Sequence, residues 1–383
     1  MSPAILYLNA VPGDLIHGMK LAGIRRYAAV RGWEVAAIPP RKFNSKNIAA
    51  LLAARRPVAG CVVEASDGDP PPPSLFGAVP VVYLHPPQSL RDGRAAYVAT
   101  DNEAVARAAF RELSARHPAA YAVVGYRLRT DWSAARMRVF ADLATQARVP
   151  CHVFDDCGTD VYVRSAESAA ALARWVAALP RHTAVFAVND GTADEVVAAA
   201  NAAGRHIPRE LALCGVDNLP AVCEAARPTI TSIQIDFERA GFLAAKLLAH
   251  GGDGPAVATV GPLMAVWRES TGGSGRREPH ILAAVERIRR EACDGLTARK
   301  VIAESPGSER LFTLRFREAT GHSVLDEIRH VRLEKVETLL AQTDTPIGAI
   351  ADFCGWGSPL ALKRYFQAQT GMTMREWRRK NRS

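Results

Sequence analysis

The last hundred residues contain two short pairs of helices, and the pattern within the second pair constrains the fold more than any other feature. In residues 345–366, Pro346 suits the first position of a helix because its missing N–H would be unpaired there in any case. Gly355 supplies the positive φ that ends this helix. Ser358 then suits the N-cap of a second helix, with Pro359 directly behind it. A capped helix that follows a tight turn is the geometry needed to enter a DNA major groove.

The first pair lies in residues 296–316, and a long helix joins the two pairs. Thr297 suits the N-cap of its first helix and Ser308 the N-cap of its second. Phe312 lies one turn before the last residue of this segment, also a phenylalanine, so the second helix has an apolar inner face. Residues 324–342 repeat apolar positions at helical spacing with charges between them, which predicts a structural bridge between the pairs.

Residues 280–380 resemble the AraC-family DNA-binding domain. The family signature appears at Ile350, Ala351, Cys354, Gly355, Trp356, Tyr365 and Phe366, and continues at Gly371-Met372-Thr373 and Trp377-Arg378. Met374 stands where the family usually has proline. The first pair departs more, because Ser305-Pro306-Gly307 forms its turn and Leu311 and Leu314 occupy positions where polar residues are common. The resemblance covers about a quarter of the chain and predicts base readout more firmly for the second pair.

This resemblance also implies which residues face DNA. The implied contacts are Arg310, Thr313, Leu314 and Arg315 in the first pair, and Pro359, Leu360, Lys363 and Arg364 in the second. Arginine suits guanine, lysine suits guanine or phosphate, and Leu360 suits a thymine methyl. Any single charge could be an ordinary solvated residue, but their joint placement after two N-caps favours groove contact.

Charge and composition agree with a nucleic-acid partner. The net charge of the 383 residues is +9, and residues 280–383 hold 18 Lys and Arg against 13 Asp and Glu, so over half the excess charge lies there. No apolar run approaches the roughly 20 residues of a membrane span. The start reads as a strand rather than a signal peptide. The seven cysteines lack zinc-ligand spacing. We therefore expect free thiols in a reducing cytoplasm, with no metal and no cofactor.

Residues 3–270 alternate short apolar strands with amphipathic helices. This alternation predicts an α/β fold of parallel sheets covered by helices on both faces. Two such runs, near 1–100 with its return and 115–240, predict two lobes with a cleft between them. The glycine-rich stretch 270–275 reads as a flexible linker. The expected domains are an effector domain at 1–270, a linker at 271–279 and an all-α double helix-turn-helix domain at 280–383.

The two predicted lobes resemble the periplasmic-binding-protein-like effector domains of LacI/GalR regulators. The resemblance is carried by ATDN at 99–102, DWSAARMRVF at 131–140, AVND at 187–190, LCGVDN at 213–218 and the stretch 228–248. This effector domain followed by an AraC-type domain is similar to the XylR xylose-operon regulators over nearly the full length. The similarity implies a sugar-responsive transcription regulator, expected to be an activator and a cytoplasmic homodimer. Its implied partners are double-stranded DNA, RNA polymerase and a monosaccharide, D-xylose or a relative.

Polar side chains directly after predicted strands are candidates for binding that sugar. A neutral polyol needs groups that donate and accept hydrogen bonds, and such groups gather in loops at the carboxyl ends of parallel strands. Asp217 follows a strand directly and is the best candidate, and Asn189 and Asp190 follow another strand in the same way. Asp14 and Glu64 are the weaker candidates from the first lobe.

The helix after Asp131 adds two more candidates. Arg136 matches the arginine that LacI-type proteins often use in the cleft, where a guanidinium can chelate adjacent hydroxyls. Trp132 could stack on the sugar face, or could simply pack. Arg136 could instead pair with a carboxylate, and Asp190 or Asp217 could cap a helix. Asp101 favours capping the next helix over ligand contact.

Two other classes of function compete with that of a regulator. The sequence contains none of the nucleophile-elbow, P-loop, dinucleotide-binding or zinc-protease motifs that mark common enzymes. We therefore expect no enzymatic activity. The alternative is a sugar-binding protein or α/β enzyme with an appended helical interaction domain. The apparent lack of an export signal and the double helix-turn-helix pattern favour the regulator.

Overall fold

The computed structural model forms two compact units, residues 1–276 and 277–383, and each is described by itself. The described residues are 2–9, 11, 13–43, 46–55, 57–65, 70–91, 95–156, 165–249, 257–272, 279–320, 323–342 and 345–381. Within these ranges, no helix has the length and apolar character to cross a membrane. Six cysteines in the same ranges are free thiols.

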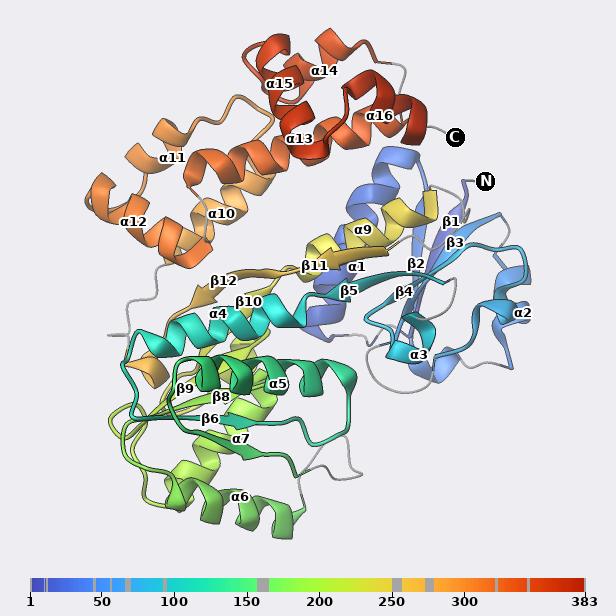
Figure 1. Cartoon of the computed structure of the whole chain (residues 1–383). Coiled ribbons are helices and arrows are strands. Elements are labelled where there is room, and N and C mark those ends of the chain that lie inside the picture. Colours follow the sequence, from blue (N-terminus) through green and yellow to red (C-terminus); the bar gives the residue numbers. More distant parts are fainter. Residues whose placement is uncertain are drawn as a thin grey trace. The chain divides into compact units, whose positions relative to one another are not determined.

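The first unit contains two six-stranded sheets (Figure 1). The first sheet has the order β11 (Val257–Val260), β5 (Ala96–Thr100), β4 (Val81–Leu84), β3 (Val58–Glu64), β1 (Ala4–Leu8), β2 (Glu34–Ile38). The second has the order β12 (Pro262–Val266), β10 (Thr231–Ile235), β9 (Leu211–Val216), β8 (Thr183–Ala187), β6 (Ala120–Val124), β7 (Cys151–Phe154). All pairings are parallel except that of β10 with β12, which is antiparallel and departs from the predicted parallel sheets. The strand order reverses beside β1 and β6, and open α/β sheets bind ligands at such reversals.

Helices cover both faces of each sheet, as predicted. The first lobe has α1 (Leu15–Arg31), α2 (Ile48–Ala53), α3 (Gln88–Arg91) and α9 (Phe237–Ala249), with 3-10 helices at Pro40–Lys42 and Pro73–Phe76. The second has α4 (Asn102–Ser114), α5 (Asp131–Gln146), α6 (Ala166–Ala178), α7 (Asp190–Ala202) and α8 (Pro220–Cys223). Helices α1 and α9 touch at two glycines. A Cβ on Gly23 would lie 1.8 Å from the carbonyl oxygen of Glu238, and one on Gly241 would lie 1.8 Å from that of Lys20.

The chain passes between the two lobes three times. It leaves the first lobe between β5 and α4, returns between β10 and α9, and passes again between β11 and β12. The first crossing agrees with the predicted boundary between the lobes at about residue 100. After the second crossing, α9 and β11 belong to the first lobe, whereas β12 belongs to the second. Strands β10, β11 and β12 were not predicted as separate elements.

The last described segment of the first unit corrects the predicted linker. Ser270 and Thr271, which opened the glycine-rich stretch, lie in a 3-10 helix at Glu269–Thr271 and are 0% and 3% exposed. The Ser270 hydroxyl donates to the carbonyl of Leu213 in β9 at 2.6 Å. These two residues are therefore part of the folded unit. Residues 273–278 of the predicted linker lie outside the described residues.

The second unit is helical, as predicted. It contains α10 (Pro279–Glu291), α11 (Ala298–Ala303), α12 (Glu309–Thr320), α13 (Val324–Gln342), α14 (Ile347–Phe353), α15 (Pro359–Thr370) and α16 (Met374–Asn381). The bridge helix α13 packs against α10, α11, α14 and α16. Val336 and Leu340 of α13 share one buried cluster with Ile350, Leu362 and Phe366 of the second helix pair.

The predicted helix ends of this unit are largely confirmed. The Thr297 side chain accepts a hydrogen bond from the backbone N–H of Lys300, and that of Ser358 accepts from Leu360 and Ala361. Gly355 has a φ of +68° and permits the turn between α14 and α15. Pro346 differs by one position from the prediction, because it precedes the first helical residue rather than occupying it.

Candidate functional site

A cavity of about 320 Å³ lies between the two lobes of the first unit. This volume falls at the lower end of the range for small-molecule sites. Its lining includes Asp14, His17, Lys20, His85 and Thr100 from the first lobe, and Asn102, Trp132, Arg136, Asn189 and Asp217 from the second. Most of these residues follow the carboxyl ends of strands or begin the next helix. Five of the seven predicted effector contacts line the cavity, whereas Glu64 and Asp190 do not.

Arg136 is the central cation of the second-lobe wall. It is 4% exposed, and its guanidinium donates through Nε to Asn102 Oδ1 at 2.9 Å and through Nη1 to the carbonyl of Val188 at 2.7 Å. Burial lowers the pKa of this guanidinium, and the carboxylates of Asp217 and Asp190 act in the opposite direction. The group remains charged, because arginine starts from a pKa above 12. The protein therefore fixes two edges of the guanidinium fork while the residue still faces the cavity.

Asp217 occupies an unusual backbone conformation at the end of β9. Its φ is +102°, and that of Asn218 is +55°, so two consecutive residues adopt a conformation that L-residues rarely take. Hydrogen bonds hold the turn: Asp217 N–H donates to the carbonyl of Ile233 at 2.9 Å, and Asn218 N–H donates to the Ser232 hydroxyl at 2.9 Å. Such strain persists where the surroundings demand it. Here it places the carboxylate of Asp217 on the cavity wall.

Asn189 and Asp190, both predicted as effector contacts, differ in position: Asn189 faces the cavity and Asp190 does not. Asn189 lines the cavity and also caps α7, with its side-chain oxygen accepting from the Thr192 N–H at 2.8 Å. Asp190, also predicted as an effector contact, does not line the cavity, because it is 0% exposed and lies behind the wall. Its carboxylate accepts from Leu219 N–H at 2.7 Å and from the Ser232 hydroxyl at 2.6 Å. Burial and the nearby Asp217 carboxylate raise the pKa of Asp190 to about 7.

The first-lobe wall rests on a buried ion pair. Lys20 Nζ lies 2.6 Å from Glu64 Oε2, and both side chains are 3% exposed. Burial acts to raise the pKa of Glu64, but Lys20, His85 and His17 outweigh it and lower that pKa to about 2. Glu64, predicted as a contact, does not line the cavity, and its Oε2 accepts hydrogen bonds from Lys20 and Tyr7. Lys20 itself lines the cavity.

Asp14 and Trp132, two further predicted contacts, lie at the cavity wall. Asp14 lines the cavity and also caps α1, accepting from the His17 N–H at 2.9 Å. Trp132 lines the cavity, with its ring centroid 5.0 Å from that of Tyr126 and 4.9 Å from the Arg136 guanidinium. The tryptophan thus both packs and faces the cavity. Asp101 is confirmed as a cap, because it accepts from Ala104 N–H at 2.9 Å and does not line the cavity.

Several cavity residues were missed by sequence reasoning. They include His17, Lys20, His85, Thr100, Asn102, Tyr126, Arg129 and Asp131. Asn102 carried a usable signal, since it ends the ATDN motif directly after β5. His85 also follows a strand, β4, and has a φ of +53°. Lys20 carried no such sequence signal, because it lies inside a helix whose cavity-facing side only the fold can identify.

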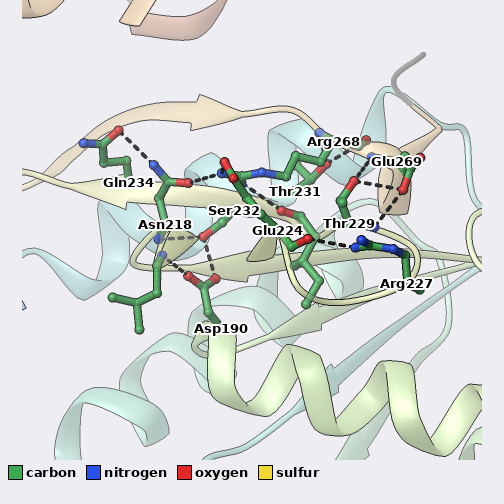
Figure 2. Close-up of polar contacts among 12 residues, drawn as sticks. Asp190, Asn218, Glu224, Arg227, Thr229, Thr231, Ser232, Gln234, Arg268 and Glu269 are labelled. Atoms are coloured by element: carbon green, nitrogen blue, oxygen red, sulfur yellow. Dashed lines mark hydrogen bonds and ion pairs between the residues drawn. The ribbon is translucent and has the colours of Figure 1, made fainter. Parts of the chain in front are cut away.

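Asn218 connects the cavity wall to the last described segment of the first unit (Figure 2). Its side-chain oxygen accepts from Arg268 Nη2 at 2.8 Å, and its nitrogen donates to Gln234 at 3.4 Å. Arg268 is 7% exposed and also donates to the carbonyl of Ile230 at 2.9 Å. The Thr231 hydroxyl donates to the Arg268 carbonyl at 3.1 Å. Direct hydrogen bonds thus join the residue next to Asp217 with the segment that leads toward the second unit.

The predicted DNA-facing residues lie on the two helices that follow the tight turns, α12 and α15. Arg310, Thr313, Leu314, Pro359, Leu360, Lys363 and Arg364 are all exposed. Arg315 is half-buried, so it lies beside the inner face rather than at the centre of the outer one. The inner faces of α12 and α15 are formed by fully buried pairs, which are Phe312 with Phe316 and Leu362 with Phe366.

Comparisons with known proteins agree with this two-part organisation. Residues 108–271 match the family described as periplasmic binding protein-like domain, and residues 305–380 match the family described as helix-turn-helix domain. The xylose operon regulatory protein of Haemophilus influenzae is 27% identical over 289 residues, which is 74% of each chain. That of Escherichia coli K12 is 26% identical and covers 74% of this chain and 73% of its own.

Solved structures show the same fold. The structure of the xylose-binding transcription activator xylR aligns with 99% of this chain and 98% of its own, at 23% identity and a TM-score of 0.57. The complex of the transcriptional regulator CelR with cellobiose aligns with 70% of this chain and 84% of its own, at 20% identity and a TM-score of 0.57. The predicted two-lobed α/β fold followed by a helical helix-turn-helix domain is thereby confirmed.

Proposed function

Because this chain is a XylR-like regulator, in which a periplasmic-binding-protein-like domain precedes a helix-turn-helix domain, we propose that it activates a sugar-utilisation operon in response to D-xylose or a closely related monosaccharide. The observation that carries the proposal is one chain that combines a polar cavity between two lobes with two helices, α12 and α15, that expose their outer faces, the second of them capped by Ser358. The names of the relatives suggest xylose. The chemistry of the cavity supports a small polyol.

The cavity offers the groups that a neutral sugar requires. Asp217 accepts hydrogen bonds from hydroxyls, Arg136 donates them, and Asn189 can do both. Trp132 supplies a flat apolar face for the C–H side of a sugar ring. A volume of about 320 Å³ suits a monosaccharide, with little space left for a second sugar residue. This is a binding site of mixed polarity, and we assign it no catalytic role.

The second unit is proposed to read double-stranded DNA. Helices α12 and α15 are proposed to enter successive major grooves about one helical turn, roughly 34 Å, apart. The candidate contacts are Arg310, Thr313 and Leu314 on α12, and Pro359, Leu360, Lys363 and Arg364 on α15. Arg315, half-buried, is a weaker candidate for a base and suits a phosphate. We propose that the protein acts in the cytoplasm as a homodimer and that RNA polymerase is its further partner.

Sugar binding is proposed to change DNA affinity through the loop that carries Asp217. A sugar held between the lobes stabilises their closed arrangement, and a ligand shifts such an equilibrium only by its differential affinity for the two states. Moving a population from 1:99 to 99:1 takes about 5.5 kcal/mol. The hydrogen bond that Arg268 donates to Asn218 provides a physical route from that loop to the segment leading into the second unit.

A thermal-shift panel of sugars tests the effector assignment. We expect D-xylose to raise the unfolding temperature of the full-length chain, because a ligand at one hundred times its dissociation constant stabilises the folded state by about 2.7 kcal/mol. The panel should include other pentoses, D-glucose and cellobiose, with Asp217→Ala as the control that loses the shift. A panel in which no monosaccharide changes the unfolding temperature would contradict the proposed effector class.

A further inference from the structure

Helices α12 and α15 of the second unit can be aligned residue by residue. Helices α12 and α15 each contain 12 residues, and every residue of α15 lies fifty positions after its counterpart in α12. The inner positions correspond, since Phe312 and Phe316 are matched by Leu362 and Phe366, all fully or nearly fully buried. The last threonine of each helix donates to the carbonyl of the inner phenylalanine four residues earlier, at 2.8 Å in both. The outward faces can therefore be compared position by position.

Those faces carry the same two residue types in opposite order. At about 100° per residue, the second and sixth positions of each helix point away from its buried pair. On α12 these positions are Arg310 and Leu314, and on α15 they are Leu360 and Arg364. Leu314 is 54% exposed and Leu360 is 56% exposed. Each helix thus presents one uncovered leucine and one arginine, one turn apart.

The chemistry of the major groove distinguishes these two side chains. A leucine has no hydrogen-bonding atom, so it can discriminate a base pair only by apolar contact, and the 5-methyl of thymine is the apolar group that the major groove offers. Arginine matches O6 and N7 of guanine with two hydrogen bonds. Residues four apart in a helix are separated by roughly 6 Å along the axis. This separation is close to two base-pair steps of about 3.4 Å.

We propose that each of these helices recognises one guanine and one thymine through its arginine and leucine, with the two bases in opposite order along α12 and α15. Leu314 and Leu360 are then specificity-determining residues. They are exposed in the free protein because bound DNA is the partner that covers them. The inference rests on the proposed function, since it specifies which bases the helix-turn-helix units read. It adds that part of the specificity is apolar.

The test uses DNA that the full-length chain selects from a random duplex pool. Each thymine of the selected sequence is replaced in turn by deoxyuridine, which removes only the 5-methyl group. We expect two positions at which this replacement weakens wild-type binding about fourfold, which corresponds to the roughly 0.8 kcal/mol of one buried methylene-sized group. Leu314→Ala should abolish the effect at one of these positions, and Leu360→Ala should abolish it at the other.

Leu311→Ala is the matched control, because Leu311 is 46% exposed on the same helix but lies to one side of the outward face. It should leave both deoxyuridine effects intact. Arg310→Ala and Arg364→Ala should each remove the sensitivity to 7-deazaguanine at one nearby position. Binding that ignores every deoxyuridine, or deoxyuridine effects that survive in both leucine variants, would overturn the inference and leave the regulator assignment standing. Failure to select any DNA would overturn the proposed function itself.

Discussion

Replacing Asp217 with alanine is expected to weaken sugar binding by about 10- to 150-fold. The carboxylate lines the cavity, and a hydrogen bond to a charged group contributes about 1.5–3 kcal/mol, which is this range when one such bond is lost. The substitution also removes the larger of the two carboxylate interactions that favour the charged form of the buried Arg136. Titration calorimetry of the full-length chain with D-xylose measures the change. DNA affinity without sugar should stay within twofold of wild type.

Two variants make that result specific to the cavity. Asp142→Ala removes a carboxylate that is 59% exposed on α5, and it should leave sugar binding unchanged. Asp217→Asn keeps one hydrogen-bond acceptor and should fall between wild type and Asp217→Ala. Wild-type sugar affinity in Asp217→Ala would remove this residue from the binding site.

Replacing Lys20 with methionine is expected to lower the free energy of unfolding by about 3–5 kcal/mol. The ammonium pairs with Glu64 at 2.6 Å, both side chains are 3% exposed, and removing one partner of a buried pair leaves an uncompensated charge. Calorimetric unfolding of the first unit within the full-length chain measures the loss. Lys20→Met combined with Glu64→Gln should recover most of it, because the buried carboxylate is then absent as well.

The pH dependence separates this electrostatic effect from simple loss of packing. In the wild type, the pKa of Glu64 is lowered to about 2, below its usual value near 4.5. Its charged form therefore contributes stability above about pH 4.5, and this contribution is lost as the pH falls from there toward 2. Lys20→Met removes the largest of the interactions that lower the pKa of Glu64, while burial and the weaker effects of His85 and His17 remain, so the residue takes up a proton at a higher pH than in the wild type. The stability gap to wild type should narrow between pH 7 and pH 5, and a constant gap would contradict the ion-pair account.

Local patterns in the sequence were sufficient to predict most helices and strands. Helix caps at Thr297 and Ser358 and the positive φ at Gly355 depend on neighbouring residues only, so their signals lie within a few positions. The cavity residues that follow strands, Asn189 and Asp217, were found for a similar reason. The carboxyl ends of parallel strands face the ligand whatever the details of packing.

The remaining features depend on contacts between distant residues. The pairing of Lys20 with Glu64 joins α1 to β3 across 44 positions, and the sequence gives no local sign of it. Asp190 and Asn189 are adjacent and chemically similar, yet only the fold decides that one is buried behind the wall and the other faces the cavity. Asn218 and Arg268 meet 50 positions apart, because the chain returns to the second lobe through β12. Edge strands such as β11 lacked a strong apolar pattern.

The most direct test of the whole account is the dissociation constant of the full-length chain for the DNA upstream of its own gene, measured with and without saturating D-xylose. Both measurements must use one salt concentration, since phosphate contacts make DNA affinity strongly salt-dependent. We predict that the two constants differ by about 5- to 150-fold, the usual range of coupling between two sites. Arg268→Gln, which cuts the hydrogen bond to Asn218, should bring their ratio toward one. Identical constants for a wild-type chain that binds the sugar would contradict the account.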